Sequence, residues 1–463
     1  MSDSYTRFVT DVTKKAFDKE HRAKLSFNIS RYDKAVLRGK EQYSNLELAK
    51  ERAAHIKNKV VTDLAKYLVD FEASFQSRGG KVIWAQDGAE AVSEVLKIVK
   101  KHQAKHIVKS KTMVTEEISL NDNLTKAGIE SLETDLGEYI VQLAGEKPYH
   151  IVTPAMHKSK EEVAALFNEK FGLDADSTPE QITAFVRGLL RDKFFNADIG
   201  ITGANFLVAD TGAVCLTENE GNALMSMSFP KVHIVIAGIE KLIPRMRDLD
   251  LFWPLLATFG TGQNITVYNS IVSGPRQEGE TDGPEEMYVI LLDNNRTEIL
   301  GHKNQRRALA CIRCGACLNV CPVYKSIGGH AYGTTYSGPI GSVITPWLKG
   351  MKEFKHLSFA SSLCGACTEV CPVKINLHEQ LLYNRNDSVK DGHASRFDKS
   401  VMFAYKTAMG KRKYLDMLSG KTKNSMLKKF FASAWGPHRE LPEVAPKSFK
   451  ELWDERRGSR KNG

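Results

Sequence analysis

The chain has 463 residues, of which 26% are charged and 42% hydrophobic, and its formal net charge is +10. This length is too great for one ordinary domain, so we expect two or three domains with conventional cores and no need for disulfides. The first residues lack the basic and apolar segments of a secretory signal, and no apolar run approaches the roughly 20 residues of a membrane span. We therefore expect a cytoplasmic protein without a transmembrane helix.

Residues 1–75 are polar and rich in helix formers, and Asn45–Phe75 predicts one or two amphipathic helices. The pattern changes at Lys81–Ala85, a short apolar strand that is followed by a helix with Asp87 as its cap and by a second strand at His106–Val108. Strand, helix and strand in this order form a βαβ unit. Such units build parallel sheets covered by helices.

The α/β region is predicted to extend over residues 76–300. We expect further strands at Tyr149–Thr153, at Val232–Ala237 and at Met287–Leu292, where apolar residues are concentrated. Ile199–Thr217 alternates apolar runs with glycines, which predicts strands joined by tight turns.

Four polar stretches follow predicted strands of this region: Lys109–Thr112, Glu133–Asp135, Ile201–Asn205 and Thr217–Asn222. Ligands of α/β proteins bind at the carboxyl ends of strands, so these stretches are candidates for the lining of a pocket. None of them is a dinucleotide-binding fingerprint or a P-loop, and ordinary turns between strands are the simpler interpretation. The residues do not identify a ligand.

The most specific pattern in the chain is Cys311-Ile-Arg-Cys314-Gly-Ala-Cys317-Leu-Asn-Val-Cys321-Pro322. It matches the bacterial ferredoxin run C-x2-C-x2-C-x3-C-P without deviation. Thiolates at this spacing wrap one turn of backbone around an iron-sulfur cluster, and Gly315 leaves room where the chain approaches it. In such runs the fourth cysteine, here Cys321, ligates the other cluster of a pair.

A second motif, Cys364-Gly-Ala-Cys367-Thr-Glu-Val-Cys371-Pro372, repeats the last three cysteines of the first. The crossed ferredoxin pattern assigns one cluster to Cys311, Cys314, Cys317 and Cys371, and the other to Cys321, Cys364, Cys367 and an unidentified fourth group. We therefore expect two clusters of the [4Fe-4S] type in a ferredoxin-type domain over residues 301–385.

Alignment of the two motifs places Ser361 opposite Cys311, so the second cluster lacks one cysteine. Three outcomes are open: a [4Fe-4S] cluster with a non-cysteine ligand, an iron with an open position, or a [3Fe-4S] cluster. Ser361 is the positional candidate for the fourth ligand, and His356 and His378 are nearby alternatives. Cys215 is a remote one, in a segment typical of a buried strand.

Two other uses of the cysteines are less well supported. A zinc site needs neither a third cysteine at this spacing nor the repeated Cys-Pro ending. Seven thiols arranged as a repeat also differ from a single cysteine nucleophile beside a base. The neighbouring positive charges of Arg313, Lys325 and Lys374 favour the reduced form of a cluster, although solvated side chains are the simpler interpretation.

Most of the net positive charge lies in a C-terminal tail, residues 386–463, which has 18 lysines and arginines against 9 aspartates and glutamates. A solvated basic surface is the ordinary interpretation, and an acidic protein or an anionic lipid surface are candidate partners. No nucleic-acid-binding motif accompanies the charge, so we expect no nucleic-acid partner.

The combination of segments resembles a known family over nearly the whole chain. These segments are Lys109–Ile118, Glu133–Glu138, Thr217–Asn222, the two Cys-Gly-Ala-Cys runs and Pro446–Trp453. Together they resemble the lactate utilization protein B family. The resemblance implies a lactate-utilisation domain with a fold similar to that of sugar isomerases and CoA transferases, followed by an α-helical ferredoxin-like region. It also implies that the seven motif cysteines are cluster ligands and that the eighth ligand is absent throughout the family.

Three hypotheses about function follow. The resemblance implies an electron-transfer subunit that acts with two companion proteins in the oxidation of L-lactate to pyruvate. The alternatives are a catalytic subunit, which binds a hydroxy acid at an open iron or in a pocket near Glu218 and Glu220, and a scaffold stabilised by its clusters. The electron acceptor is not identified by the sequence.

Overall fold

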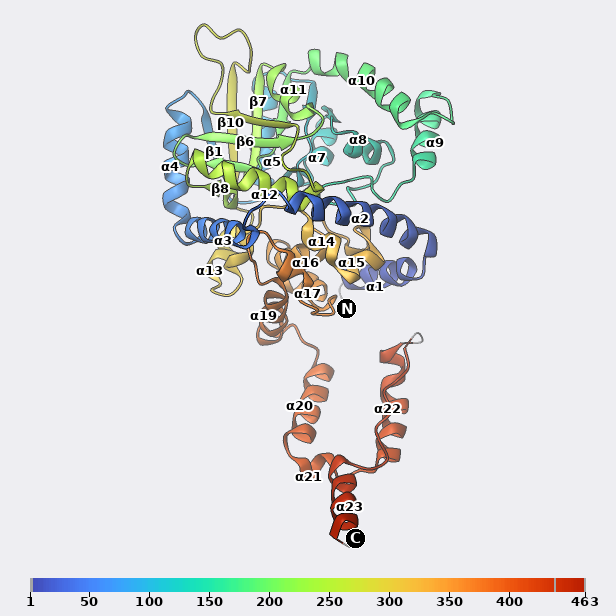
Figure 1. Cartoon of the computed structure of the whole chain (residues 1–463). Helices are drawn as coiled ribbons and strands as arrows, with labels where there is room; N and C mark the ends of the chain where they lie inside the picture. Colours follow the sequence, from blue (N-terminus) through green and yellow to red (C-terminus); the bar gives the residue numbers. More distant parts are fainter. Residues whose placement is uncertain (1–2, 437–438, 462–463) are drawn as a thin grey trace. The chain divides into compact units, whose positions relative to one another are not determined.

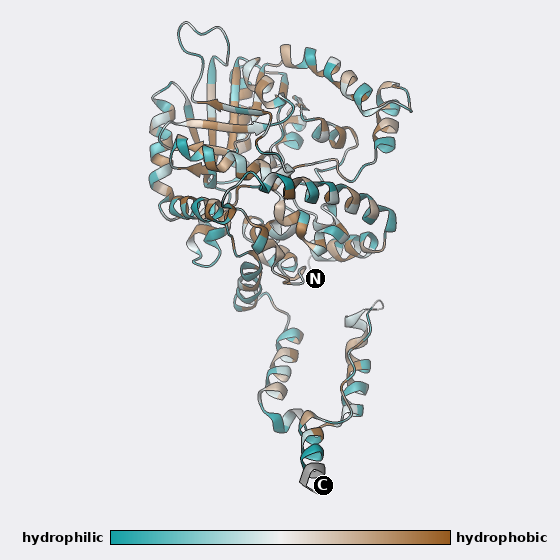
Figure 2. Cartoon of the chain, in the orientation of Figure 1, coloured by the Kyte–Doolittle hydropathy of each residue, from teal (hydrophilic) through white to brown (hydrophobic). Residues whose placement is uncertain are grey.

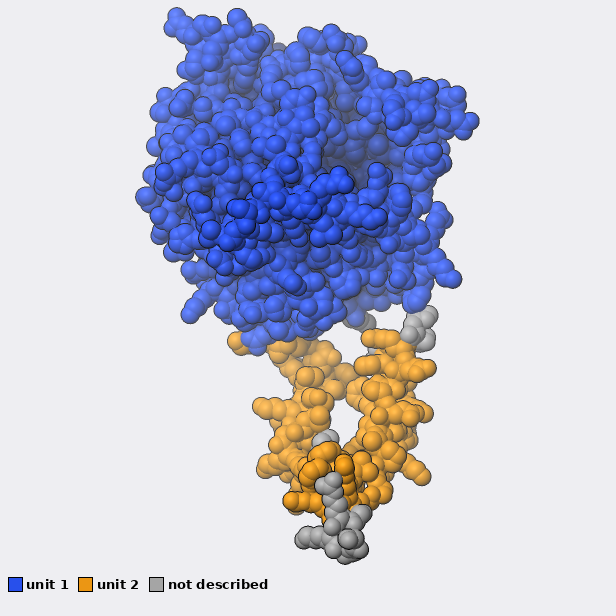
Figure 3. Space-filling view, viewed as in Figure 1, with its two compact units in different colours: residues 1–388 blue, residues 389–463 orange. Residues whose placement is uncertain are grey.

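The computed structural model describes residues 3–436 and 439–461. The chain divides into two compact units, residues 1–388 and 389–463 (Figure 3). The first unit contains all of the strands and both cysteine motifs (Figure 1).

The main sheet of the first unit has six strands, all of them parallel. Their order across the sheet is β1 (Lys81–Ala85), β10 (Glu286–Leu292), β7 (Val232–Gly238), β4 (Ile199–Thr202), β2 (His106–Lys109) and β3 (Glu130–Glu133). This confirms the predicted parallel α/β fold. The last strand, β10, pairs with both β1 and β7 and therefore lies inside the sheet.

The central strands are mostly apolar because helices cover both faces of the sheet. On one face, Ile234 and Ile236 of β7 pack in a core with α5 (Gly88–Lys101). On the other face, Val235 packs in a core with Phe71 of α4 (Leu64–Gln76). Alternate residues of β7 therefore pack in two different cores, one on each face of the sheet. Figure 2 shows the hydropathy of the residues along these strands.

A second sheet has the strand order β8 (Leu242–Ile243), β5 (Phe206–Val208), β6 (Ala213–Glu218) and β9 (Tyr268–Val272). With β4 it confirms the strands predicted within Ile199–Thr217. The predicted strand Tyr149–Thr153 is wrong, because this segment is a loop. The ring nitrogen Nδ1 of His150 accepts the N–H groups of Val152 and Thr153 at 3.0 and 3.3 Å, so side chains rather than a ladder satisfy the backbone here.

Helices make up the rest of the first unit. Before the main sheet come α1 (Asp3–Ala16), α2 (Lys19–Lys40), α3 (Leu46–Thr62) and α4; between its strands lie α6 (Met113–Glu117), α7 (Leu120–Lys126), α8 (Leu136–Leu143), α9 (Lys160–Phe171), α10 (Pro179–Phe195), α11 (Asn222–Ser228) and α12 (Leu249–Thr261). After β10 come α13 (Arg296–Gly301), α14 (Ala316–Val320), α15 (Pro322–Ile327), α16 (Gly338–Leu348), α17 (Met351–Phe359), α18 (Ala366–Val370) and α19 (Leu377–Lys390), whose last residues enter the second unit.

The N-terminal helices pack on the cysteine region. Helix α1 contacts α15 and α17, and α2 contacts α12, α14 and α15. In Figure 1, α2 and α12 lie between the strands and the helices that carry the cysteines. One continuous core joins Leu25 and Ile29 of α2 to the apolar residues around the cysteines, so the N-terminal segment and the cysteine region fold against each other.

The second unit consists of the helices α20 (Arg396–Gly410), α21 (Arg412–Leu415), α22 (Gly420–Trp435) and α23 (Phe449–Lys461). It exposes large apolar side chains such as Phe397, Phe403 and Phe430 next to its many basic residues. Within the described part of the chain, none of the helices combines the length and the apolar character that a bilayer-spanning segment requires.

Candidate metal centre

The two cysteine motifs share one backbone conformation. Arg313 and Gly315 of the first motif have φ angles of 62° and 80°, and the matching Leu363 and Gly365 of the second have 55° and 82°. Each glycine begins a short helix, α14 or α18, at a left-handed conformation that side chains rarely adopt. The sequence repeat is therefore also a structural repeat.

Gly315 is needed for space as well as for its φ angle. A Cβ atom at this position would lie 3.1 Å from Cγ2 of Val152 and 3.3 Å from Cε1 of His150. The loop that was wrongly predicted as a strand thus packs closely over the first cysteine motif.

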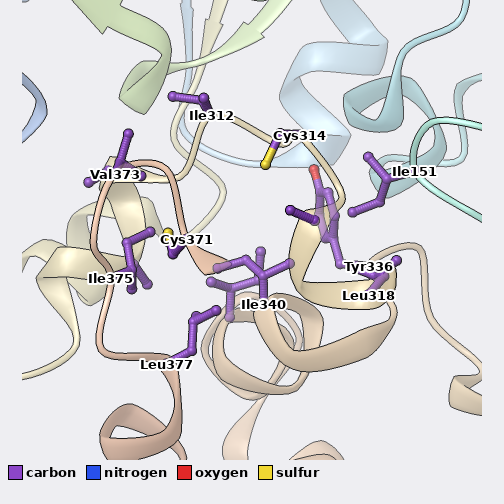
Figure 4. Packing of buried hydrophobic residues seen from close by; sticks show 14 of the residues in the cluster. Ile151, Ile312, Cys314, Leu318, Tyr336, Ile340, Cys371, Val373, Ile375 and Leu377 are labelled. Carbon is purple, nitrogen blue, oxygen red and sulfur yellow. The ribbon is translucent and has the colours of Figure 1, made fainter. Parts of the chain in front are cut away.

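Packing of α14 against α18 brings the two motifs together. Cys311, Cys314 and Cys317 line one small cavity together with Cys371 of the other motif, and the remaining wall is apolar. Figure 4 shows Cys314 and Cys371 among Ile312, Ile340, Ile375 and Leu377. A closed apolar cavity with four thiols on its wall fits a cluster, because thiolates are the ligands that iron-sulfur clusters use.

The other three motif cysteines form a second group. Burial, together with the nearby Cys321 and Cys364, raises the pKa of the Cys367 thiol to about 11. Burial also raises the pKa of Cys321, and Cys364 adds to that shift. The side chain of Cys364 is exposed, so this group reaches the surface, whereas none of the four cysteines of the group with Cys371 is exposed.

Backbone N–H groups point at sulfur atoms in both groups. The N–H of Arg313 donates to Sγ of Cys311 at 3.4 Å, and the N–H of Tyr324 donates to Sγ of Cys321 at 3.5 Å. Such bonds stabilise the negative charge of ligating sulfur and are one means by which proteins set cluster potentials. All eight cysteines are free thiols, as expected for ligands.

Ser361 stands in the second motif where Cys311 stands in the first. Its Oγ accepts the N–H of Leu363 at 3.1 Å, as Sγ of Cys311 accepts the N–H of Arg313. The backbone therefore presents the serine oxygen in the position of the missing thiolate.

The other candidates for the fourth ligand have different environments. His356 is buried in aromatic contact with Phe8, with ring centroids 5.1 Å apart. His378 has Nδ1 2.7 Å from Oγ1 of Thr368. Cys215 lies fully buried in β6, where burial raises the pKa of its thiol to about 12.

The three positive charges that were expected to act on the clusters differ in their surroundings. Arg313 is only 11% exposed and lies over the ring of Tyr336, with 4.6 Å from its guanidinium carbon to the ring centroid. Lys325 and Lys374 are partly exposed and pair with carboxylates of α2 and α3. Arg313 is therefore the charge whose effect solvent screens least.

Arg313 also belongs to a buried ion-pair network. Its Nη2 lies 3.3 Å from Oε1 of Glu240, and the other oxygen of Glu240 accepts from Nε of Arg296 at 2.6 Å. Arg296 in turn binds both oxygens of Glu117 at 2.9 Å, and the hydroxyl of Tyr336 donates to Glu117 at 2.6 Å. This network joins the α/β region to the first cysteine motif.

A polar cavity adjoins the first cysteine group. It has a volume of about 380 Å³, and all four of the polar stretches that follow strands contribute to its wall. Those stretches supply Ser110, Lys111, Thr112, Asp135, Asn205, Thr217, Glu218, Glu220 and Asn222. Arg313, Cys314, Tyr336 and Lys241 also line the pocket, so it touches the first cysteine group. Arg313 and Cys314 belong to the first cysteine motif. No sequence pattern identified Tyr336 or Lys241 as residues of a pocket.

Glu218 and Glu220, proposed from the sequence as substrate-binding residues, line this pocket but also hold its walls. The carboxylate of Glu218 accepts the N–H groups of Ala223 and Leu224 at 2.8 Å, and Glu220 accepts the N–H of Leu136 at 3.1 Å. Burial, together with the negative charge of Asp135, raises the pKa of Glu220 to about 7. Their first role is to cap and position helices α11 and α8.

Comparisons with known proteins give family matches to two separate parts of the chain. A family model of the LUD domain matches residues 68–292, and one of the 4Fe-4S dicluster domain matches residues 307–375. The chain is 43% identical to proteins named lactate utilization protein B from Bacillus cereus (strain AH820), Bacillus thuringiensis (strain Al Hakam) and Bacillus anthracis (strain A0248), over 92% of this chain and of each relative. A crystal structure of a DUF162 family protein from Deinococcus radiodurans matches 50% of this chain and 98% of its own, with 13% identity and a TM-score of 0.28.

Proposed function

The chain belongs to the lactate utilization protein B family, and from this premise we propose that it passes electrons through two iron-sulfur clusters during the oxidation of L-lactate to pyruvate. Companion lactate-utilisation proteins supply the remaining steps. The observation that carries the proposal is the cavity lined by Cys311, Cys314, Cys317 and Cys371, with a second cysteine group beside it.

The first cluster is assigned to the four cysteines of that cavity. The second is assigned to Cys321, Cys364, Cys367 and Ser361, as a [4Fe-4S] cluster or, without the serine, a [3Fe-4S] cluster. Bound clusters supply one-electron oxidation and reduction. The chain's own part is to hold both sites within one core, exclude water from the first and donate N–H groups to the ligating sulfurs.

The burial of the two groups supports a direction of transfer. The first group has no exposed cysteine and borders the large pocket, whereas the second contains the exposed Cys364. We infer that electrons enter at the first cluster and leave from the second to an acceptor protein docked near Cys364. A reducing compartment such as the cytoplasm keeps the thiols available as ligands.

A second candidate function is catalysis by this chain alone. It is favoured by the contact of the pocket with Cys314 and by the buried cations Arg313 and Lys241 on the pocket wall, which suit the carboxylate of a hydroxy acid. A third, structural function of the clusters requires only that they stabilise the core.

Iron and acid-labile sulfide analysis with EPR on anaerobically purified protein tests the proposal. Two reducible clusters, with lactate oxidation only after addition of the companion proteins, are the expected result. Turnover by the isolated chain would instead favour the catalytic function, and clusters that physiological reductants do not reduce would favour the structural one. Cys215→Ser serves as the control and is expected to retain both clusters, because Cys215 lies in β6 away from both motifs.

A further inference from the structure

A second group of ionisable side chains lies at the carboxyl ends of two neighbouring strands, outside the iron-sulfur sites. Lys109 ends β2 and Glu133 ends β3, and the two residues are partners in the parallel register. Glu116 of α6 and Glu138 of α8 face the same point, and one carboxylate oxygen from each of the three glutamates lies within 4.8 Å of the others. Glu133 and Glu138 are 1% and 2% exposed.

Hydrogen bonds satisfy only part of this group. Oε1 of Glu133 accepts from Nζ of Lys109 and from Nδ2 of Asn121, each at 2.7 Å. Lys109 also donates to Oγ1 of Thr115 at 2.9 Å and lies 4.0 Å from Glu116. Oε2 of Glu133 and Oε1 of Glu138 are buried without any partner.

The charges of this group do not balance. Three carboxylates meet one ammonium group in direct contact, Lys109, with Lys111 as a further nearby positive charge, so negative charge remains in excess beside the buried oxygens of Glu133 and Glu138. Uncompensated buried charge is costly, so the group needs either protons or a cation. One divalent cation neutralises the excess and gives the free oxygens a partner.

The spacing suits a small hard cation. Mg²⁺ binds oxygen ligands at about 2.0–2.1 Å in an octahedron, so opposite ligands are separated by about 4 Å. The three carboxylate oxygens lie within 4.8 Å of one another, so a shift of a few tenths of an ångström in the side chains brings them to this separation around one ion. We propose that Glu116, Glu133 and Glu138 bind one divalent cation, Mg²⁺ or Mn²⁺, with Lys109 as the fixed positive charge on the outer side of Glu133.

The ion would stabilise a wall of the large pocket. Lys111 and Asp135, which line the pocket, each lie two residues beyond a residue of the site in the chain. Asp135 also accepts the N–H of Glu138 at 2.9 Å as the cap of α8. A cation shared by α6, α8 and β3 holds these segments together at the rim of the pocket.

A second group with suitable residue types, Glu146, His157 and His330, has no unpartnered carboxylate oxygen, although Nδ1 of His157 is buried without a hydrogen-bond partner among the described residues. Both oxygens of Glu146 already have partners, Nζ of Lys158 at 2.7 Å and Nε2 of His157 at 2.6 Å. Nε2 of His330 donates to the carbonyl of Lys147 at 2.7 Å. This group is balanced without a cation and provides a matched control.

Mn²⁺ binding to the full chain with its clusters assembled, after removal of divalent ions, tests the proposal. The EPR signal of free Mn²⁺ at room temperature measures binding, since cluster signals require low temperature. We expect one Mn²⁺ per chain, displaced by Mg²⁺, with affinity reduced about tenfold or more in Glu133→Gln and Glu138→Gln. Glu146→Gln is expected to bind as the wild type does.

Glu116→Gln decides the test if the buried variants do not fold, because Glu116 is partly exposed and its substitution disturbs the core least. It too is expected to weaken binding about tenfold or more. Wild-type protein that binds no Mn²⁺, or binding that is unchanged by all three substitutions or lost in Glu146→Gln, would overturn the proposal. Cluster iron and sulfide are measured separately, so this outcome leaves the electron-transfer proposal untouched.

Discussion

Nη2 of Arg313 lies 3.3 Å from Oε1 of Glu240, and through this contact the first cysteine motif joins the buried network of the α/β region. Arg313 lies between Cys311 and Cys314, the proposed cluster ligands, in sequence. The same guanidinium therefore holds the fold together and lies beside the proposed first cluster.

Removal of the Arg313 charge is expected to lower the reduction potential of the first cluster. A nearby positive charge stabilises the reduced, more negative form, and about 1 kcal/mol of this interaction equals roughly 40 mV for one electron. We expect a decrease of about this size in Arg313→Gln, measured by EPR redox titration, and retention of the potential in Arg313→Lys. Lys374→Gln, which removes a partly exposed and salt-bridged charge, should change potentials several-fold less.

Glu240→Gln should destabilise the first unit. Glu240 is 1% exposed and sits between Arg296 and Arg313, so its neutralisation leaves Arg313 without its carboxylate and Arg296 with Glu117 alone. The expected loss is about 3–5 kcal/mol in the free energy of unfolding, measured with urea. Glu130→Gln removes an exposed pair with Lys193 and is expected to cost less than about 1 kcal/mol.

The same carboxylate gives a pH dependence with a defined sign. Although burial opposes ionisation, Arg296 and Arg313 hold the pKa of Glu240 at about 2, below its usual value of 4.5. Its contribution to stability is complete above pH 4.5 and is lost as the pH falls toward 2. Unfolding curves of the wild type should show this loss, and those of Glu240→Gln should lack it.

Cysteine variants distinguish crossed from sequential cluster ligation. Because Cys371 lines the same cavity as Cys314, both Cys371→Ser and Cys314→Ser should remove the first cluster and about half of the iron. Cys321→Ser should instead affect the same EPR signal as Cys364→Ser. Sequential ligation predicts the opposite grouping, with Cys371 and Cys364 acting on one signal.

Ser361→Cys should complete the second cluster. The serine oxygen repeats the hydrogen bond of Cys311 Sγ, so a thiol at this position is placed to bind the fourth iron. We expect the variant to resist oxidative conversion to a three-iron cluster, measured as loss of the corresponding EPR signal in air. The neighbouring Ser362→Cys is the control, and an equal effect of both variants would contradict the assignment.

Glu138→Gln should remove a destabilisation that grows with pH. Burial and the neighbouring carboxylates Glu133 and Glu116 raise the pKa of Glu138 to about 8, against the opposing charges of Lys109 and Lys111. A raised pKa favours the protonated form, so stability without divalent cations is lost as the pH rises from 4.5 through 8. At pH 8 the variant should melt about 2 °C or more above the wild type, and calorimetry at pH 4.5 should show no such gain.

Local patterns determined much of this protein from the sequence. The period of the apolar residues predicted β1, β7 and β10, the cap at Asp87 predicted the start of α5, and the spacing from Cys311 to Cys321 predicted a ferredoxin-type site. These features depend on residues close together in the chain, where backbone geometry and side-chain period act directly. The predicted strand Tyr149–Thr153 is wrong because side chains satisfy its backbone, His150 from within the segment and Lys111 from outside it.

Only the tertiary structure decided which distant residues meet. The crossed motif predicted that Cys371 joins Cys314, and the packing of α14 against α18 is how the fold brings them together, but no pattern predicted that Glu240 meets Arg313. The contact between the pocket and the cysteines, and the unpaired oxygens of Glu133 and Glu138, arise in the same way. The physical reason is that these contacts come from burial of whole helices and strands against one another, and no local spacing records which surfaces will pair.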